Sequence, residues 1–366
     1  MGNPQTITEL ATMVRDTTGP IVPRGAGLHQ VIGNPARAES TVIDLRDLKT
    51  ISDYIPSDLT ITVGAGMVLG EIQDILAVNR QWLPWDAPQH RDATIGGLLA
   101  SGLSGPLRHG AGSPRDWLLG MHFVTGDGRI IKSGGKVVKN VAGYDMHKLH
   151  IGALGTLGII AEVSFKLAPL PDADESLTIT GMSIEHAHNM AYVLRTPPFN
   201  PSAFLIEATP HHIRLWVRWQ GAADAVTRQV NIAHVRHPIA KSTTTGSWEA
   251  LLNTPFNKSH GYAGQLRIGC APQSLLSLYP VLQALAPKAT LHIMPTVGLI
   301  RLYAAHIPDI TALRAALLPL GAYVVVEIGD DPIRWGPPPP NLAILHQLKK
   351  AWDPDNKLNP GRYVIE

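Results

Sequence analysis

The sequence predicts an α+β protein built from two domains, and three observations lead to this prediction. The chain has 366 residues, which is long enough for two domains that each bury a core. In its second half, short strands alternate with helical patterns, and the strands suit a sheet with one covered face, as in α+β domains. The pattern of predicted elements changes near residue 171, where Pro169, Pro171 and the acidic run DADE mark a domain boundary.

The first domain shows helical and strand patterns in a mixed order. Apolar residues recur at helical spacing at Ile7, Leu10 and Val14, and β-branched residues are enriched in the expected strands. The elements expected in order are a helix at 5–18, a short strand ending at Pro23, strands at 41–48 and 59–66, a helix at 69–81 and a strand at 158–171.

The second domain is expected to alternate strands with four helices, at 184–195, 222–235, 274–286 and 309–318. The polyproline run GPPPP predicts a stiff linker, and a further helical pattern and a tail follow it. We therefore predict three parts, namely a first domain over 1–170, a second over 171–335, and a linker, helix and tail over 336–366 that return to the first domain.

The composition excludes several classes of function. The chain carries 31 basic and 29 acidic residues without a basic stripe, so nucleic acid is not an expected partner. Charged residues make up only 16%, against about 25% in typical soluble domains, which favours a surface covered by partner subunits over a loop-rich monomer. A single cysteine, Cys270, excludes an intramolecular disulfide and any cysteine-ligated zinc or iron–sulfur site.

The sequence shows neither a signal-peptide pattern nor a run of eighteen apolar residues. We therefore expect a cytoplasmic chain with at most peripheral association with the inner face of the membrane.

Glycine is concentrated between residues 88 and 160, where it adds little buried surface and costs ordering entropy. Three glycine-containing loops, at 24–29, 94–97 and 155–158, each offer consecutive backbone N–H groups that can bind an anion. Three such loops in one domain favour a dinucleotide ligand. The run Gly64–Gly70 is similar to a nicotinamide-binding fingerprint, but Asp86 lies between Trp85 and Pro88 rather than after a second strand, so we prefer a simple strand-to-helix turn.

Several motifs together resemble the vanillyl-alcohol-oxidase-type (PCMH) flavoproteins. They are PRGAG, TIGG, GDGRIIKSGGKVVKNVAGYD, GTLGI and the terminal DPDNKLNPGR, in that order along the chain. Within the family, they are most similar to the FAD-binding subunits of bacterial glycolate oxidase (glycolate dehydrogenase) complexes. The resemblance implies a PCMH-type FAD-binding domain of two α+β subdomains and a ferredoxin-like α+β cap domain. It is dense over residues 20–170 and returns at 352–362.

The resemblance also implies which residues contact FAD. Backbone N–H groups of the first two loops would hold the diphosphate, and residues after them would line the ring system. Leu28 occupies the place of the histidine that tethers flavin in some relatives, so FAD is expected to be non-covalent. The complete expected set is Arg24, Gly25, Ala26, Gly27, Leu28, His29, Pro88, Thr94, Ile95, Gly96, Gly97, Ala100, Ser101, Gly105, Arg108, Gly110, Gly155, Thr156, Gly158 and Ile160.

Oxidation of a 2-hydroxy acid needs a cation for the carboxylate and a base for the hydroxyl proton. Relatives with this activity carry histidine- and glutamate-containing metal motifs, whereas the matching segments here read MPTVGLIR and EIG. Arg301 can bind a carboxylate, but His211, His212 and His292 are interpreted as structural residues. No metal site is expected, and no catalytic residue is assigned.

The resemblance implies an FAD-dependent oxidoreductase subunit of a 2-hydroxy acid dehydrogenase complex. It would relay electrons or support assembly with a larger FAD-binding subunit and an iron–sulfur subunit. The alternatives are a self-sufficient FAD-dependent D-lactate or glycolate dehydrogenase, a peptidoglycan-precursor reductase and a non-enzymatic scaffold subunit. The motif residues of such a reductase are not recognisable in the sequence. The intact glycine loops argue against a scaffold that has lost its flavin.

Overall fold

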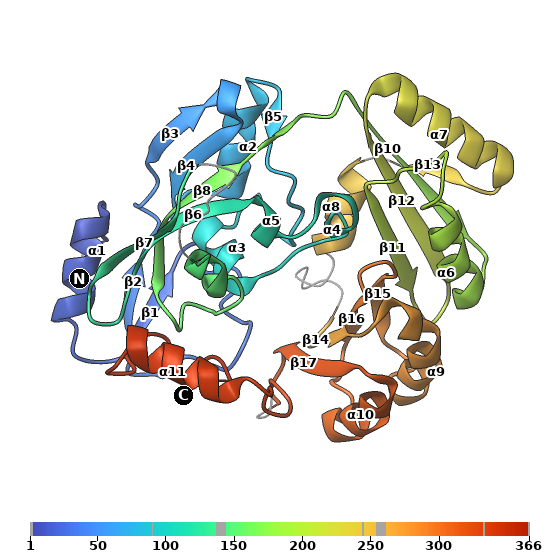
Figure 1. Cartoon of the computed structure of the whole chain (residues 1–366). Coiled ribbons are helices and arrows are strands. Elements are labelled where there is room, and N and C mark those ends of the chain that lie inside the picture. The colour runs from blue at the N-terminus through green and yellow to red at the C-terminus, as the bar shows by residue number, and fades with distance from the viewer. Residues whose placement is uncertain are drawn as a thin grey trace. The chain divides into compact units, whose positions relative to one another are not determined.

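The computed structural model describes residues 3–89, 91–136, 144–243, 245–253, 261–331 and 334–364 (Figure 1). Residues 137–143, which hold most of the distinctive KNVAGYD motif, lie outside the described part. The chain forms two compact units. The first contains residues up to 104, 113–170 and 337 onward, and the second contains 105–112 and 171–336.

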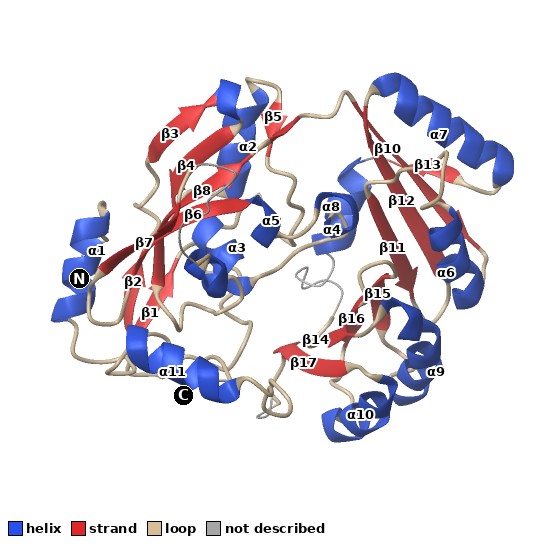
Figure 2. Ribbon diagram, viewed as in Figure 1, coloured by secondary structure: helices blue, strands red, loops and turns tan. Residues whose placement is uncertain are grey.

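The first unit contains three groups of strands, which are drawn in red in Figure 2. A small parallel sheet pairs β1 (Ile21–Arg24) with β2 (Thr41–Asp44), and an antiparallel five-stranded sheet has the order β3-β4-β8-β6-β7. The strands of the larger sheet are β3 (Ile51–Ile55), β4 (Thr60–Gly64), β6 (Leu118–Val124), β7 (Ile130–Gly134) and β8 (Ile159–Lys166), and a separate short pair is formed by β5 (Gln81–Trp82) and β9 (Ala168–Pro169). The helices are α1 (Ile7–Asp16), α2 (Leu69–Ala77), α3 (Ile95–Ser101), α5 (Pro114–Trp117) and α11 (Leu342–Trp352), with 3-10 turns at Pro56–Asp58 and Met146–His150.

Local chemistry explains where these elements begin and end. The Thr6 side chain accepts a hydrogen bond from the Glu9 amide and begins α1, whose apolar face is buried. The strand predicted at 41–48 ends at Asp44, because its carboxylate accepts the Arg46 amide and turns the chain. The helix predicted at 69–81 ends at Ala77, and Arg80 adopts a left-handed conformation before β5.

The second unit contains one antiparallel sheet with the strand order β13-β10-β12-β11-β15-β16-β14-β17. Its strands are β10 (Ala173–Thr180), β11 (Ala203–Ala208), β12 (Ile213–Gly221), β13 (Lys241–Thr243), β14 (Gly264–Gly269), β15 (Thr290–Met294), β16 (Leu299–Ala304) and β17 (Tyr323–Ile328). The helices are α4 (Arg108–Ala111), α6 (Ile184–Val193), α7 (Ala223–Arg236), α8 (Thr245–Asn253), α9 (Leu275–Leu285) and α10 (Ile310–Leu317), with 3-10 turns at Pro272–Ser274 and Leu318–Leu320.

The ferredoxin-like arrangement expected once occurs twice in this sheet. The strands β10 to β13 with α6 and α7 form one β-α-β-β-α-β unit, and β14 to β17 with α9 and α10 form another. The two repeats join where β11 pairs with β15, with Ile206 opposite Ile293. All four predicted helices are confirmed within a few residues, and they cover one face of the sheet over a shared apolar core (Figure 2).

The C-terminal helix and tail belong to the first unit. Lys349 is buried, and its ammonium group donates to Asp353 at 2.5 Å and to the carbonyls of Thr156 and Leu358 at 2.9 Å. The Asp353 carboxylate also accepts the amides of Lys357 and Leu358. This buried network fixes the tail against the first unit. None of the described helices has the length and apolar content needed to cross a membrane.

A buried histidine in this region makes stability depend on pH. The His150 ring stacks on Trp352 with centroids 5.3 Å apart, lies 4.0 Å from Phe123, and has an unpartnered Nε2. Burial lowers the pKa of His150 to about 3, against roughly 6.5 in an unfolded chain. Between these values the unfolded state binds more protons, so stability falls as the pH drops from about 6.5 toward 3.

We expect His150 to cost about 2 kcal/mol of stability between pH 7 and pH 5. In His150→Phe the ring contacts remain and this contribution is lost, so the free energy of unfolding should fall less over that range. Urea unfolding at both pH values measures the difference. The exposed His306, changed to Gln, is the control, and an equal pH dependence in wild type and His150→Phe would refute the assignment.

Candidate cofactor-binding site

The three glycine-containing loops predicted to bind a dinucleotide converge in the first unit. They line two adjoining cavities that share seven residues, which are Pro23, Gly25, Thr94, Gly97, Ala100, Leu154 and Asn359. The first cavity is completed by Val22, Ala26, Gly27, Leu28, His29, Gln30, Ala93, Ser101 and Arg362. The second is completed by Leu45, Ala65, Gly96, Gly155, Gly158, Ile159 and Ile160.

The first loop follows β1 and presents unpaired backbone donors. Within the described part of the chain, the amides of Gly25, Ala26 and Gly27 donate to no acceptor. Unsatisfied neighbouring N–H groups beside a cavity favour an anionic ligand such as a diphosphate. The nearby Arg24 side chain lies 3.7 Å from Asp44 and is not among the cavity-lining residues.

Two glycines let the loops approach one another closely. A Cβ atom on Gly25 would lie 2.0 Å from the Thr94 hydroxyl oxygen, so only glycine brings the first loop against the second. Gly155 has a φ of +71°, and its Cβ would lie 3.0 Å from Pro23 and 3.2 Å from the Asn359 amide nitrogen. The third loop therefore packs against both Pro23 of β1 and the C-terminal tail.

Asn359 lies in the wall of both cavities. Its backbone amide donates to Ile21 at 2.9 Å, and its Nδ2 donates to the Leu154 carbonyl at 2.7 Å. Its Oδ1 is buried and has no partner, which leaves an acceptor for a ligand. Arg362, in the same tail, lines the first cavity and donates to the Ile32 carbonyl. The NPGR motif was the available signal, but only the fold shows where it returns.

Other predicted contact residues do not line these cavities. Ile95 is buried beneath the α3 turn, and the Thr156 hydroxyl donates to the Ala153 carbonyl within its own loop. Pro88 contacts His29 instead of the cavities, and its carbonyl oxygen lies 3.2 Å from the His29 Nε2. Gly105, Arg108 and Gly110 belong to the second unit, where the Gly110 amide donates to Ser202. Their predicted contact with the ring system stays a prediction.

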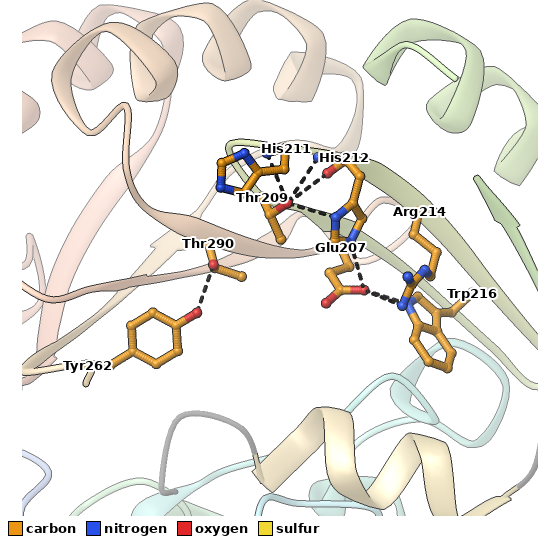
Figure 3. Close-up of polar contacts among 8 residues, drawn as sticks. All are labelled: Glu207, Thr209, His211, His212, Arg214, Trp216, Tyr262 and Thr290. Atoms are coloured by element: carbon orange, nitrogen blue, oxygen red, sulfur yellow. Dashed lines mark hydrogen bonds and ion pairs between the residues drawn. The ribbon is translucent and has the colours of Figure 1, made fainter. Parts of the chain in front are cut away.

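The histidines considered for catalysis lie in the second unit. His211 and His212 occupy the β11–β12 hairpin, where both backbone amides donate to the Thr209 hydroxyl (Figure 3). His292 is a β15 residue paired in register with Arg301. Among the described residues, no group of three or more histidine, cysteine or acidic side chains is arranged to hold a metal ion.

Comparison with known proteins gives related FAD-binding sequences and a similar fold. The family described as an FAD binding domain matches residues 2–134. The chain is 35% identical over 210 residues to the glycolate oxidase subunit GlcE of Escherichia coli (strain K12), covering 57% of each protein. It is 32% identical over 188 residues to the glycolate oxidase subunit GlcD of Bacillus subtilis (strain 168), covering 50% of this chain and 39% of that protein. The match thus spans less than two thirds of either relative.

A solved structure of alkyldihydroxyacetonephosphate synthase has a similar fold. It matches 98% of this chain and 75% of the other, with a TM-score of 0.73 and 18% sequence identity. At this identity the similarity shows the fold alone. The unpaired donors of the first loop, the unpartnered Asn359 acceptor and the family match agree on the ligand. Residues 2–134 therefore carry an FAD binding domain, and the cofactor of this domain is FAD.

Proposed function

We propose that this chain is the FAD-binding subunit of a 2-hydroxy acid dehydrogenase complex that oxidises glycolate or a close analogue. The convergence of three glycine-containing loops on joined cavities is the observation that carries the proposal. The glycolate oxidase subunits among the relatives support the substrate class. Bound FAD supplies a two-electron acceptor for oxidation of an alcohol to a carbonyl.

The residues present fit FAD in distinct roles. The amides of Gly25, Ala26 and Gly27 would hold the diphosphate, since they are unpaired and consecutive. The Asn359 Oδ1 would accept a hydrogen bond from a hydroxyl or amide of the cofactor. Leu28 lines the first cavity with an aliphatic side chain that forms no bond to flavin, so the cofactor would be held non-covalently.

The chain would pass electrons to, or assemble with, a larger FAD-binding subunit and an iron–sulfur subunit. Its only cysteine is Cys270, whose thiol pKa is raised by burial, so any iron–sulfur cluster must be supplied by another subunit. Such a complex would associate with the membrane only at its periphery.

Purification of the chain alone tests the cofactor assignment. We expect a yellow protein with flavin absorbance, whose FAD is released by denaturation because no covalent bond retains it. A colourless protein that stays without flavin after addition of FAD would overturn the proposal. Co-expression with a candidate large subunit, followed by size exclusion, tests the assembly, and separate elution would count against it.

The role of Asn359 can be tested with a matched pair of variants. Asn356 and Asn359 both have positive φ, of 49° and 43°, and both have a buried, unpartnered Oδ1, but only Asn359 lines the cavities. Asn359→Gly keeps the backbone relaxed and should weaken FAD binding about tenfold, because a ligand hydrogen bond is lost. Asn356→Gly should bind FAD as wild type does. Fluorescence titration measures the FAD affinity of both variants, and equal affinities would refute the proposed role of Asn359.

A further inference from the structure

The C-terminal tail extends the small parallel sheet of the first unit. Leu358 forms a parallel bridge with Ile21 of β1. The Ile21 amide donates to the Lys357 carbonyl at 2.7 Å, and the Asn359 amide donates to the Ile21 carbonyl at 2.9 Å. The strand β1 therefore lies between β2 and the tail, and the first glycine-containing loop of the cofactor site begins where β1 ends.

The side chain of Lys357 reaches from this tail to the C-terminal end of α1. Its ammonium group donates to the carbonyls of Val14 and Thr17, at 3.0 Å each, and the residue is only 7% exposed. The Val14 carbonyl is one of the last four in α1, which have no donor within the helix. A cation at this position is also attracted by the negative end of the helix dipole. The end of α1 therefore holds Lys357 in place.

The next residue of the tail enters the apolar core beneath α1. Leu358 is fully buried in a cluster that contains Leu10 and Val14 of α1. The same cluster contains Leu45 and Ile159, which line the second cavity. None of the described residues of α1 lines either cavity itself. The tail and this core therefore connect α1 to the cofactor site.

Asn359 follows at the cavity wall and depends on its neighbours for its position. Its φ of 43° lies in the left-handed region, which a residue with a side chain adopts only when the surrounding contacts hold it there. A hydrogen bond from an N–H donor needs a distance of roughly 2.7–3.2 Å, so the Oδ1 acceptor can serve a ligand only while the backbone at this residue stays fixed.

We propose that Lys357 is a positioning residue for FAD, which acts through Asn359. Its two hydrogen bonds fix the tail to the end of α1 and hold the Asn359 acceptor at the cavity wall. The helix α1 then contributes to FAD affinity without contacting the cofactor. The inference rests on the proposed role of Asn359, whereas the attachment of the tail to α1 rests on the contacts alone.

A double-mutant cycle tests whether Lys357 acts through Asn359. Lys357→Met keeps an unbranched side chain but leaves two carbonyls without their donor, and it should weaken FAD binding about fivefold. In the Asn359→Gly background, the same change should alter the affinity less than about twofold, because the acceptor that Lys357 positions is already absent. Fluorescence titration with FAD measures the four affinities.

Two other lysine variants serve as controls. Lys357→Arg keeps donors for the same carbonyls and should bind FAD within about threefold of wild type. Lys350→Met removes an exposed lysine of α11 and should leave the affinity unchanged. Urea unfolding and near-ultraviolet circular dichroism check that each variant folds.

Hydrogen exchange gives an independent readout, because coupling between two sites is reciprocal. In the wild-type chain, amides in the last turn of α1 should exchange at least about threefold more slowly when FAD is bound. This protection should disappear in Lys357→Met. Amides of α7, in the second unit, are the control and should not share the change.

Three results would overturn the inference. They are wild-type affinity in folded Lys357→Met, equal losses from Lys357→Met with and without Asn359, and unchanged exchange in α1 when FAD binds. The last result decides the question even if Lys357→Met fails to fold. Wild-type affinity in Asn359→Gly would refute the role of Asn359 and this inference together, whereas a loss in Asn359→Gly without one in Lys357→Met would refute the inference alone.

Discussion

Replacing Gly97 by leucine is expected to abolish FAD retention while leaving the fold intact. Gly97 lines both cavities, and a Cβ added there meets only the Thr94 hydroxyl, at 3.1 Å. The position lies in α3 without a positive φ, so leucine suits the backbone. The larger side chain would instead occupy space needed by the cofactor. We expect affinity for FAD to fall at least about a hundredfold, or roughly 3 kcal/mol.

A graded series separates cavity filling from damage to the fold. Gly97→Ala should give an intermediate loss, because one methyl group occupies less of the cavity than a leucine side chain. Gly19 is the matched control, since it also lacks a positive φ and a Cβ there meets nothing within 4 Å. Gly19→Leu should retain flavin absorbance at the wild-type ratio. Full flavin occupancy in a folded Gly97→Leu protein would contradict the site.

Asp353→Asn is expected to destabilise the first unit by about 3–5 kcal/mol, because it leaves the buried Lys349 ammonium group without its counter-charge. Burial already lowers the pKa of Lys349, and the Asp353 carboxylate opposes this effect. An asparagine amide would also face the Leu358 or Lys357 amide, donor against donor. Urea unfolding of the first unit measures the loss of stability. Since the same network fixes the tail that carries Asn359, FAD affinity should fall as well.

Two further variants test whether the unpaired charge of Lys349 causes this loss of stability. Asp355→Asn alters an exposed carboxylate two residues away and should change stability by less than about 0.5 kcal/mol. The double variant Lys349→Met/Asp353→Asn removes both charges and should be more stable than Asp353→Asn alone. A double variant that is no more stable than Asp353→Asn would exclude the unpaired charge as the cause.

Local patterns in the sequence were enough to predict much of the framework. Side-chain spacing and backbone requirements over short stretches of sequence predict the α1 helix, the four helices of the second unit and the glycine-containing loops. Where a side-chain hydrogen bond opposed the predicted pattern, the element ended at a different residue from the one predicted. At Asp44, the side chain accepts the Arg46 amide, and β2 ends earlier than predicted. α8 was not predicted, although the Trp248 indole donates to Ser176 on β10 and Trp248 packs against Trp216. Long-range contacts of this kind leave no local signal.

Glycine content and loop spacing are local properties, so they were enough to predict that separate stretches of backbone bind a diphosphate-containing cofactor. Which residues meet at the site follows from the folded chain and not from any local pattern. Gly25 and Asn359 line the same cavity, although more than 300 residues separate them in the sequence. In the second unit, the fold places His292, Arg301 and Glu327 on one face of a sheet. Strand order and register set these neighbours, and both depend on the burial of the whole core rather than on any single segment.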